Sequence, residues 1–260
     1  MKLQGKVACI TGAGRGFGRA AAMAMAKEGA ALVLVSRTAS ELKETAETIQ
    51  ARGGGRALFF SADITRSDAV QDLVREAVSC YGRIDILMNN AAVTGPIKPL
   101  CEMEEHEWNS VLAANLSAAF VASRIVVPYM KMQGGGKIIN VTSGLGTIVI
   151  PFFGPYSVTK AGLIHFTRML AEELKDSNIQ VNGLDPGMMD TRMQADVRAR
   201  GPEVLGRESY HRFMSAQKSG VLKSPEQPAR LAVFLASAAS DTITGQNGTE
   251  RHYLQYGYSC

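Results

Sequence analysis

The sequence predicts an α/β protein whose single domain is built on a doubly wound parallel sheet. Six short runs of apolar and β-branched residues alternate with longer stretches of helical pattern along the 260 residues. The short runs are apolar throughout rather than alternating with polar residues, which indicates strands covered on both faces. Glycine triplets at 53–55 and 134–136 mark turns between these elements.

The elements are expected in strict alternation from the amino terminus. The predicted strands are KVACIT at 6–11, ALVLVS at 31–36, RALFFSA at 56–62, IDILMNN at 84–90, KIINVTS at 137–143 and IQVNGLD at 179–185. The predicted helices are residues 17–29, 40–52, 67–81, 105–132 and 155–177. The first helix contains RAAAMAMA, whose small side chains allow close packing on a sheet, and the next two carry interleaved charges. Since no linker, repeat or low-complexity tract breaks the series, we expect residues 1–260 to form one domain.

Residues 188–223 interrupt this alternation after the last predicted strand. The segment is charged, has a helical pattern and is dotted with Met and Phe. A long insertion at the carboxyl end of a strand is where such folds place a substrate lid, so we expect a helical lid here.

Composition excludes several classes of function. Hydrophobic residues make up 46% of the chain, which is ample for a core, and the net charge is only +4, with no basic stripe that would follow a nucleic acid. No apolar run approaches membrane-spanning length, and the first, VACI, is too short for a signal peptide. The cysteines and histidines show no metal-ligand or disulfide spacing: Cys9, Cys80, Cys101, Cys260, His106, His165, His211 and His252. We expect a cytoplasmic protein without a metal, with Cys9 buried.

The segment TGAGRGFG at 11–18 joins the first predicted strand to the first helix. Gly12, Gly16 and Gly18 allow a tight turn and a close approach of a pyrophosphate, and the helix amino terminus offers free N–H groups to that anion. A purely structural turn is the alternative interpretation.

Tyr156 and Lys160 in YSVTK stand four positions apart, on one face of a predicted helix. By themselves they are equally consistent with a packed tyrosine and a solvated lysine. Their meaning depends on the other motifs of the chain.

The motifs taken in order resemble the short-chain dehydrogenase/reductase family over about residues 3–248. They are TGAGRGFG, Asp63 after the third strand, NNAA at 89–92, Asn115 in a helix, Ser143 at a strand end, YSVTK, and PGMMDT at 186–191. Within the family the chain is most similar to the 3-oxoacyl-[acyl-carrier-protein] reductase type. The resemblance implies a Rossmann-type fold and an oxidoreductase that uses a nicotinamide dinucleotide.

Four residues are expected to carry the chemistry. Hydride transfer to a carbonyl leaves an alkoxide, and Tyr156 can give it a proton. The ammonium of Lys160 should lower the pKa of that phenol, and Ser143 can hydrogen-bond the substrate oxygen. The resemblance implies that Lys160 also binds the nicotinamide ribose and that Asn115 holds a water that passes protons to Lys160. The alternative for Asn115 is a helix-bending polar residue that is satisfied internally.

Other residues receive cofactor roles from the resemblance. It implies that Asp63 meets the adenine with Ile64 beside it, that Asn89 braces the sheet near the glycine loop, that Ala91 passes the ribose, and that Thr191 meets the carboxamide. The complete set of predicted cofactor contacts is Gly12, Arg15, Gly16, Phe17, Gly18, Ser36, Arg37, Asp63, Ile64, Asn90, Ala91, Ala92, Tyr156, Lys160, Pro186, Gly187, Met189 and Thr191. Asp185 is interpreted as a turn residue without a catalytic role.

The predicted cofactor is NADP(H). The second strand ends in Ser36 and Arg37, where an acidic residue would bind the free 2′-hydroxyl of NAD(H). A guanidinium there can hold a 2′-phosphate, and Arg15 of the glycine loop can approach the same phosphate. The alternative is that Arg37 points into solvent or stacks on the adenine without selecting a cofactor.

The expected substrate is an apolar ketone or a 3-oxoacyl thioester. The predicted pocket residues are apolar: Leu145, Ile148, Ile150, Phe152, Phe153, Met188, Met189, Phe213 and Met214. Five arginines of the insertion either meet an acidic group of the substrate or form a solvated face: Arg192, Arg198, Arg200, Arg207 and Arg212. Oxidation of a secondary alcohol is the alternative reaction. A non-catalytic dinucleotide sensor is disfavoured because Tyr156 and Lys160 are both present.

A homo-tetramer or homo-dimer is expected from the resemblance, with residues 105–132 and 155–177 as the pairing surface. At the end of the chain ITGQNGTERHYLQYGYSC replaces the DGG-like turn of the family. The tyrosines of this atypical tail, residues 249–260, suit an interface, and a frayed terminus is the alternative.

Overall fold

Seven parallel strands form the sheet of this α/β domain, and the structure, a computed structural model, describes residues 1–259. The strands are β1 (Val7–Thr11), β2 (Ala31–Ser36), β3 (Ala57–Ser61), β4 (Ile86–Asn89), β5 (Gly136–Val141), β6 (Ile179–Leu184) and β7 (Asn247–Gly248). Their order is β3-β2-β1-β4-β5-β6-β7. The order reverses between β1 and β4, which is where folds of this kind bind ligands beyond the carboxyl ends of the strands. Cys260, the last residue of the predicted tail, lies outside the described residues.

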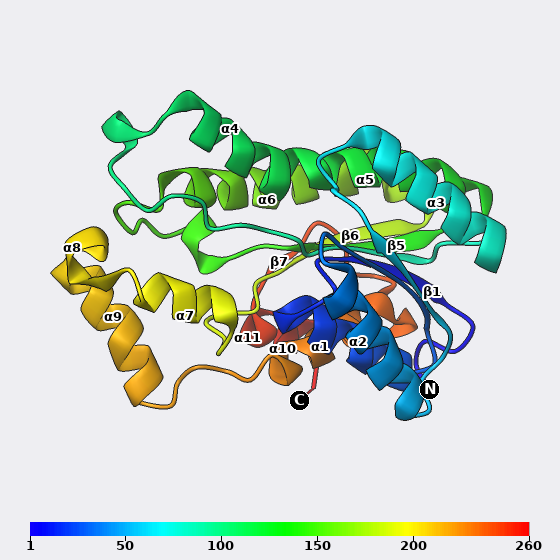
Figure 1. The fold of residues 1–260 in the computed structure, drawn as a ribbon. Helices are drawn as coiled ribbons and strands as arrows, with labels where there is room; N and C mark the ends of the chain where they lie inside the picture. Colours follow the sequence, from blue (N-terminus) through cyan, green and yellow to red (C-terminus); the bar gives the residue numbers. More distant parts are fainter. Residues whose placement is uncertain (260) are drawn as a thin grey trace.

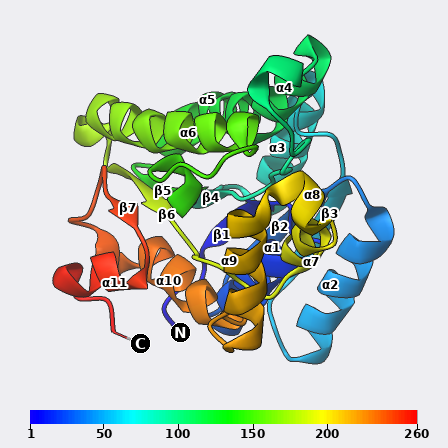
Figure 2. The ribbon, with the colours of Figure 1, turned by 90° about the vertical axis from the view of Figure 1, so that its left-hand side faces the viewer.

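Helices cover both faces of the sheet, as the apolar strands predict (Figure 1). One layer consists of α3 (Ser67–Tyr81), α4 (Glu105–Leu112), α5 (Ala118–Met132) and α6 (Gly154–Glu173). The other consists of α1 (Gly16–Lys27), α2 (Ala39–Ala51), α10 (Glu226–Ala236) and α11 (Glu250–Tyr253). The predicted helical insertion forms α7 (Arg192–Arg198), α8 (Gly201–Leu205) and α9 (Arg207–Lys218), which lie together at one end of the molecule (Figure 2).

Successive side chains along a strand pack into the two hydrophobic cores on opposite faces of the sheet. In β1, Ala8 and Ile10 pack into the layer of α1 and α10, whereas Val7 and Cys9 pack into the layer of α3 and α5. A strand buried on both sides cannot carry a polar face, which explains why the runs are apolar throughout. Burial raises the pKa of the Cys9 thiol to about 12, so this cysteine is an inert core residue.

The predicted helix at 105–132 is divided, which the sequence did not indicate. A π-helical turn, Ala113–Ser117, separates α4 from α5. The side chain of Asn115 binds the backbone of Val93 from inside this turn, accepting from its N–H at 2.8 Å and donating to its carbonyl at 2.9 Å. The insertion of these bonds accounts for the wider turn.

The elements after residue 223 were also not predicted. Helix α10 is buried along most of its length between α1 and the sheet, so its sequence, EQPARLAVFLA, lacks the polar face that marks a surface helix. Strand β7 is only two residues long and contains Gly248. Neither element carries a periodic signal strong enough to detect.

The tail is folded onto the domain, which rejects the frayed-terminus interpretation for residues 249–259. The ring of Tyr253 is fully buried, and its hydroxyl donates to the carbonyl of Gly183 in β6 at 2.7 Å. Tyr258 packs edge-on against Phe234 of α10, with 5.5 Å between the ring centres. Two of the three tail tyrosines therefore serve the intramolecular core.

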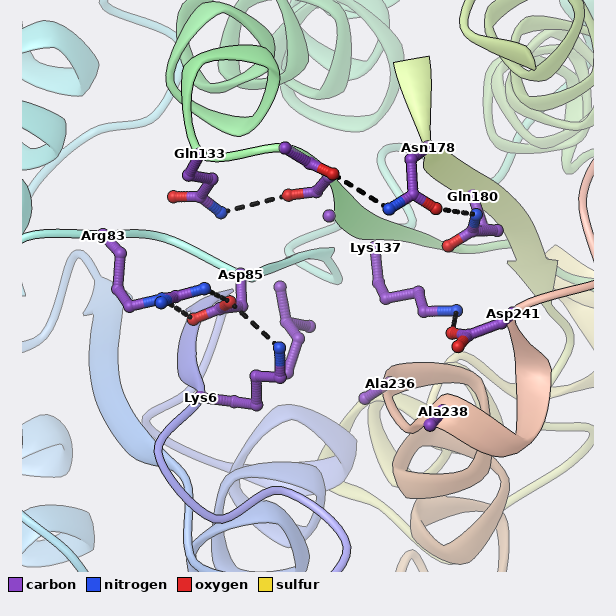
Figure 3. Close-up of a pocket in the computed structure, with 14 residues that line it drawn as sticks. Lys6, Arg83, Asp85, Gln133, Lys137, Asn178, Gln180, Ala236, Ala238 and Asp241 are labelled. Carbon is purple, nitrogen blue, oxygen red and sulfur yellow. Dashed lines mark hydrogen bonds and ion pairs between the residues drawn. The ribbon is translucent and has the colours of Figure 1, made fainter. Parts of the chain in front are cut away.

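A hollow of about 210 Å³ lies at the amino ends of the strands, opposite the predicted catalytic residues (Figure 3). The carboxylate of Asp85 accepts from Arg83 at 2.6 Å and from Lys6 at 3.4 Å. On the other side of the hollow, Lys137 pairs with Asp241 at 2.6 Å. These ion pairs neutralise the charges around the hollow and connect the amino ends of the strands. We therefore interpret the hollow as a structural feature.

Candidate active site

The glycine loop between β1 and α1 packs tightly against the neighbouring backbone. Gly12 and Gly16 have φ values of 68° and 55°, which favour glycine. A Cβ on Gly12 would lie 2.9 Å from the Cα of Ala91, and a Cβ on Gly18 would overlap the carbonyl oxygen of Gly12. Close packing of backbone on backbone therefore requires glycine at positions 12 and 18, and the positive φ favours it at position 16.

The amino terminus of α1 is open to an anion. Its N-cap residue, Arg15, makes no capping hydrogen bond through its side chain, and its first turn holds no acidic residue. The first N–H groups of a helix have no partner within the helix and carry a partial positive charge. This terminus fits the pyrophosphate of a dinucleotide.

Asn90 and Thr11 hold the loop to the end of β4. The amide of Asn90 donates to the carbonyls of Thr11 at 2.8 Å and of Gly12 at 3.2 Å. In return, the hydroxyl of Thr11 accepts from the N–H groups of Asn90 at 3.0 Å and Ala91 at 3.1 Å. These four bonds join the two strands on either side of the switch point.

The bracing role predicted for Asn89 belongs to Asn90. Successive side chains of a strand point to opposite faces, so Asn89 turns away from the glycine loop. Its amide donates to Asn140 of β5 at 2.8 Å and to Ser123 of α5 at 3.3 Å. Asn89 therefore stabilises the other face of the sheet.

Ser143, Tyr156 and Lys160 come together at the carboxyl edge of the sheet. Ser143 follows β5, and Tyr156 and Lys160 lie in the first turns of α6. Ser143 hydrogen-bonds the phenol of Tyr156. The ammonium of Lys160 is buried, donates to the carbonyl of Val141 at 2.6 Å and lies 5.6 Å from the centre of the Tyr156 ring. Tyr156 and Lys160, the predicted catalytic pair, thus lie close to Ser143.

The expected lowering of the pKa of Tyr156 by Lys160 is not what the structure shows. Burial raises the pKa of Tyr156 to about 12, and the hydrogen bond from Ser143 only partly offsets this. Burial also lowers the pKa of Lys160 to about 8. Desolvation is the largest influence on the pKa of each group, and the ammonium of Lys160 donates to the carbonyl of Val141 instead of to the phenol.

Asp185 belongs to the electrostatics of this site, although the sequence suggests only a turn residue. Its carboxylate does form the turn, accepting from the N–H of Gly187 at 2.9 Å. Its negative charge also raises the pKa values of both Tyr156 and Lys160. Burial raises the pKa of Asp185 itself. The signal available in the sequence was its position directly after a strand that ends at the site.

The side chain of Asn115 is used internally, as in the alternative interpretation of this residue. Besides its two bonds to Val93, its amide donates to the hydroxyl of Thr159 at 3.2 Å. Thr159 is the neighbour of Lys160 on α6. Asn115 therefore connects the loop after β4 to the catalytic helix, and its part in proton transfer stays a prediction.

The segment after β6 returns to the glycine loop. Pro186 is buried, Gly187 has a φ of 74°, and Met189 forms a backbone bridge with Lys223. The methyl group of Thr191 lies 3.8 Å from the position of a Cβ on Gly16. Residues 186–191 thus close the site on the side opposite Asn90 and Ala91.

The end of β2 lies beside the same loop, with Ser36 and Arg37 followed by α2. The positive charge of Arg37 contributes to lowering the pKa of the Asp63 carboxyl. The larger causes are hydrogen bonds from the backbone and hydroxyl of Thr65, at 2.9 Å and 2.8 Å. Arg15 pairs with Glu41 of α2 at 3.2 Å, a contact that the sequence did not reveal.

An apolar cluster joins the loop after Ser143 to the insertion. Six of the predicted pocket residues belong to it or pack against it: Leu145, Ile150, Phe152, Phe153, Met188 and Phe213. Ile148 is instead exposed, and Met189 packs against the core beside α1. Phe152 has a φ of 73°, a strained value for a residue with a side chain, of the kind found at functional sites.

The arginines of the insertion differ in burial. The side chain of Arg198 is only 8% exposed and lies 3.7 Å from Asp190, so it is not part of a solvated face. The other four are exposed, as the solvated-face interpretation predicts: Arg192, Arg200, Arg207 and Arg212.

A doubly wound sheet with an uncapped helix terminus at its switch point, and a half-buried tyrosine and a buried lysine nearby, is typical of a dinucleotide-dependent oxidoreductase. Residues 6–201 match the family model described as short chain dehydrogenase. The chain therefore belongs to the short-chain dehydrogenase/reductase family, which uses nicotinamide dinucleotides, and the predicted family and fold are confirmed.

Similar proteins cover nearly the whole chain. The 3-oxoacyl-[acyl-carrier-protein] reductase FabG of Thermotoga maritima is 35% identical over 249 residues, covering 95% of this chain and 96% of the relative. A crystal structure of a short-chain dehydrogenase/reductase from Burkholderia xenovorans aligns with a TM-score of 0.87 at 33% identity, over 95% of both chains. The structure of an NAD+-bound xylitol dehydrogenase aligns with a TM-score of 0.86 at 27% identity, over 96% of this chain and 98% of that one.

The titration of Lys160 gives a testable pH dependence. The profile of kcat/KM for the cofactor reports groups of the free enzyme, and it should fall above a pH of about 8 as the ammonium loses its proton. Asp185→Asn removes a charge that raises the pKa of Lys160, so the fall should move to lower pH. Asp176→Asn, an exposed change remote from the site, is the control. A profile that is unchanged or displaced upward in Asp185→Asn would contradict this assignment.

Proposed function

We propose that the protein is an NADPH-dependent reductase that converts a carbonyl to a secondary alcohol, with Tyr156 as the proton donor. The observation that carries this proposal is the grouping of the half-buried Tyr156 with Ser143, which lowers the pKa of its phenol, and with Lys160, whose ammonium lies 5.6 Å from the ring centre. Around it are the glycine loop on one side and the apolar cluster of the insertion on the other.

The protein residues then have separable tasks. A bound nicotinamide supplies the hydride. Ser143 orients the carbonyl oxygen, and Tyr156 delivers a proton to the same oxygen. Lys160, whose ammonium is charged below a pH of about 8, is the residue that would bind the nicotinamide ribose.

A proton donor for reduction must carry its proton, and burial keeps the phenol of Tyr156 in that form at neutral pH. An alkoxide is a much stronger base than a phenolate, so a phenol with a pKa of about 12 still gives up its proton to it. Oxidation of an alcohol needs the phenolate as a base, and burial makes that form scarce at neutral pH. The similarity to a xylitol dehydrogenase supports the oxidative reaction as the second candidate.

Tyr156→Phe tests the proton donor directly. We expect kcat to fall by about a hundredfold or more, the usual contribution of a positioned general acid, while the Kd for the cofactor stays within about twofold. Stopped-flow or steady-state kinetics and a fluorescence titration measure the two quantities. Tyr129→Phe, on α5, is the matched control and should retain full activity. A Tyr156→Phe enzyme with more than about a tenth of the normal rate would overturn the assignment.

The substrate class follows from the lining of the site. The cluster beside Tyr156 is apolar and includes Leu145, Phe152 and Met188. This lining suits an apolar ketone or the acyl chain of a 3-oxoacyl thioester. The relative from Thermotoga maritima is named for a 3-oxoacyl substrate, which supports the thioester as the first compound to assay.

NADP(H) is the proposed cofactor because of charge at the end of β2. Ser36 at the end of β2 is uncharged, Arg37 follows it, and Arg15 lies in the glycine loop, so two arginines belong to the edge where the adenosine ribose binds in such folds. A guanidinium holds a phosphate by paired, charge-assisted hydrogen bonds. The NAD+-bound neighbour shows that the fold also accepts the other cofactor.

Arg37→Asp should reverse this preference. The ratio of kcat/KM with NADPH to that with NADH is expected to fall by about tenfold or more, the value of one charge-assisted hydrogen bond to a phosphate. Lys43→Asp, the same charge reversal on an exposed position of α2, is the control. A wild-type enzyme that prefers NADH, or a ratio that Arg37→Asp leaves unmoved, would refute NADP(H) as the cofactor.

We also propose that the chain forms a homo-tetramer or homo-dimer through α5 and α6. The helical run Glu105–Met132 is apolar enough and long enough to cross a membrane, judged by length and composition alone. In its most apolar stretch of 18 residues, 39% is buried. One side of this helical run packs on the sheet, and the side that faces away from the sheet is uncovered. On that uncovered side the rings of Phe120 and Phe166 lie 6.4 Å apart, measured between their centres. Exposed apolar side chains continue onto α6 at Val158 and Met169. Such a face suits a second copy of the chain.

Light scattering at micromolar concentration measures the assembly. A mass of two or four chains is expected, and Phe120→Glu should shift it toward one chain, because a carboxylate would be buried in the interface. A single-chain mass for the wild type would reject the proposal.

A further inference from the structure

Glu41 lies against the glycine loop at the point where the adenosine ribose is proposed to bind. It belongs to the first turn of α2, and its side chain is 28% exposed. A Cβ placed on Gly14 would lie 2.9 Å from the Cβ of Glu41, 3.2 Å from its Oε2 and 3.1 Å from the hydroxyl of Ser36. The carboxylate and Ser36 thus converge on one small region above Gly14.

The same carboxylate engages one of the two arginines assigned to the 2′-phosphate. Nη1 of Arg15 lies 3.2 Å from Oε1 of Glu41. Thr45, one turn further along α2, fixes this approach by donating to the carbonyls of Gly14 at 3.2 Å and of Glu41 at 2.9 Å. The contact is therefore built into the packing of α2 on the loop.

We propose that Glu41 is a specificity-determining residue that competes with an adenosine 2′-phosphate for Arg15. The proposal rests on the cofactor site described above and deepens it. A phosphate that binds Arg15 must break the Glu41 ion pair and then lie close to a free carboxylate of the same sign. A ribose with a free 2′-hydroxyl meets no such repulsion and can donate a hydrogen bond to the carboxylate. Glu41 thereby limits the preference for NADP(H) that Arg37 creates.

The chain contains a matched pair for comparison. Arg19 of α1 and Glu44 of α2 form an ion pair between the same two helices, at 2.8 Å. Glu44 is the more exposed of the two glutamates, at 65%, and its partner also bonds Thr48, away from the glycine loop. Glu44→Gln therefore removes the same charge from the same helix without touching Gly14 or Ser36.

The test uses adenosine fragments, so it does not depend on catalysis. Isothermal titration calorimetry compares adenosine 2′,5′-bisphosphate with adenosine 5′-monophosphate, which differ only in the 2′-phosphate. Glu41→Gln should raise the affinity for the bisphosphate by about fivefold, as expected for release of one partly exposed ion pair, and leave the monophosphate within about twofold. Glu44→Gln should change neither affinity.

A double variant identifies the mechanism. If Glu41 competes for Arg15 as well as repelling the phosphate, the gain in bisphosphate affinity should be smaller when Glu41→Gln is combined with Arg15→Gln. The proposal is overturned if Glu41→Gln leaves the ratio of the two affinities unmoved, if Glu44→Gln raises it equally, or if the gain is undiminished without Arg15. Melting temperatures of the variants verify that α2 remains folded.

The result is separable from the choice of cofactor. Failure of Arg37→Asp to change the NADPH to NADH ratio would reject NADP(H) as the cofactor, while the fragment ratio would still report whether Glu41 opposes a 2′-phosphate. Conversely, an Arg37→Asp enzyme that behaves as expected, combined with an unmoved fragment ratio in Glu41→Gln, would reject the role of Glu41 alone.

Discussion

The close approach of the glycine loop to the end of β4 is the constraint on which the rest of the structure depends. Four hydrogen bonds join Thr11 and Gly12 to Asn90 and Ala91 across the switch point of the sheet. The absence of a Cβ at Gly12 and Gly18 allows the backbones to meet. This contact directs the first turn of α1 toward the edge where β5 and β6 also end. The proposed dinucleotide site and the proposed catalytic residues therefore occupy one side of the sheet, and the ion pairs of Figure 3 occupy the other.

Burial dominates the electrostatics of the catalytic residues. A tyrosine and a lysine on one helical face attract each other when the phenol is ionised, yet here desolvation moves both pKa values toward the neutral forms. The outcome suits a donor that keeps its proton until an alkoxide forms. Asp185 adds a negative charge that raises both pKa values, so the loop after β6 acts on the electrostatics of the proposed site as well as forming the turn.

Much of this arrangement could be predicted from the sequence, because strands buried on both faces and a glycine loop have strong local patterns. The six predicted strands agree with the structure to within two residues at each end. What could not be predicted depends on contacts between distant residues. The break at Ala113–Ser117 arises from a bond between Asn115 and Val93, and the ion pair of Arg15 joins it to Glu41. The pKa of Tyr156 depends on burial, which no spacing of residues reveals. Helix α10 escaped detection because it is buried on nearly all sides.

The central claim is that this site transfers hydride from a nicotinamide to a carbonyl carbon. The most direct measurement uses NADPH with two deuterium atoms at C4 of the nicotinamide and a panel of apolar ketones and 3-oxoacyl thioesters. Mass spectrometry of the product should find one deuterium on the carbinol carbon of the alcohol, in equal amount to the NADP+ formed. An alcohol without deuterium, or no reduction of any compound in the panel by either cofactor, would contradict the account.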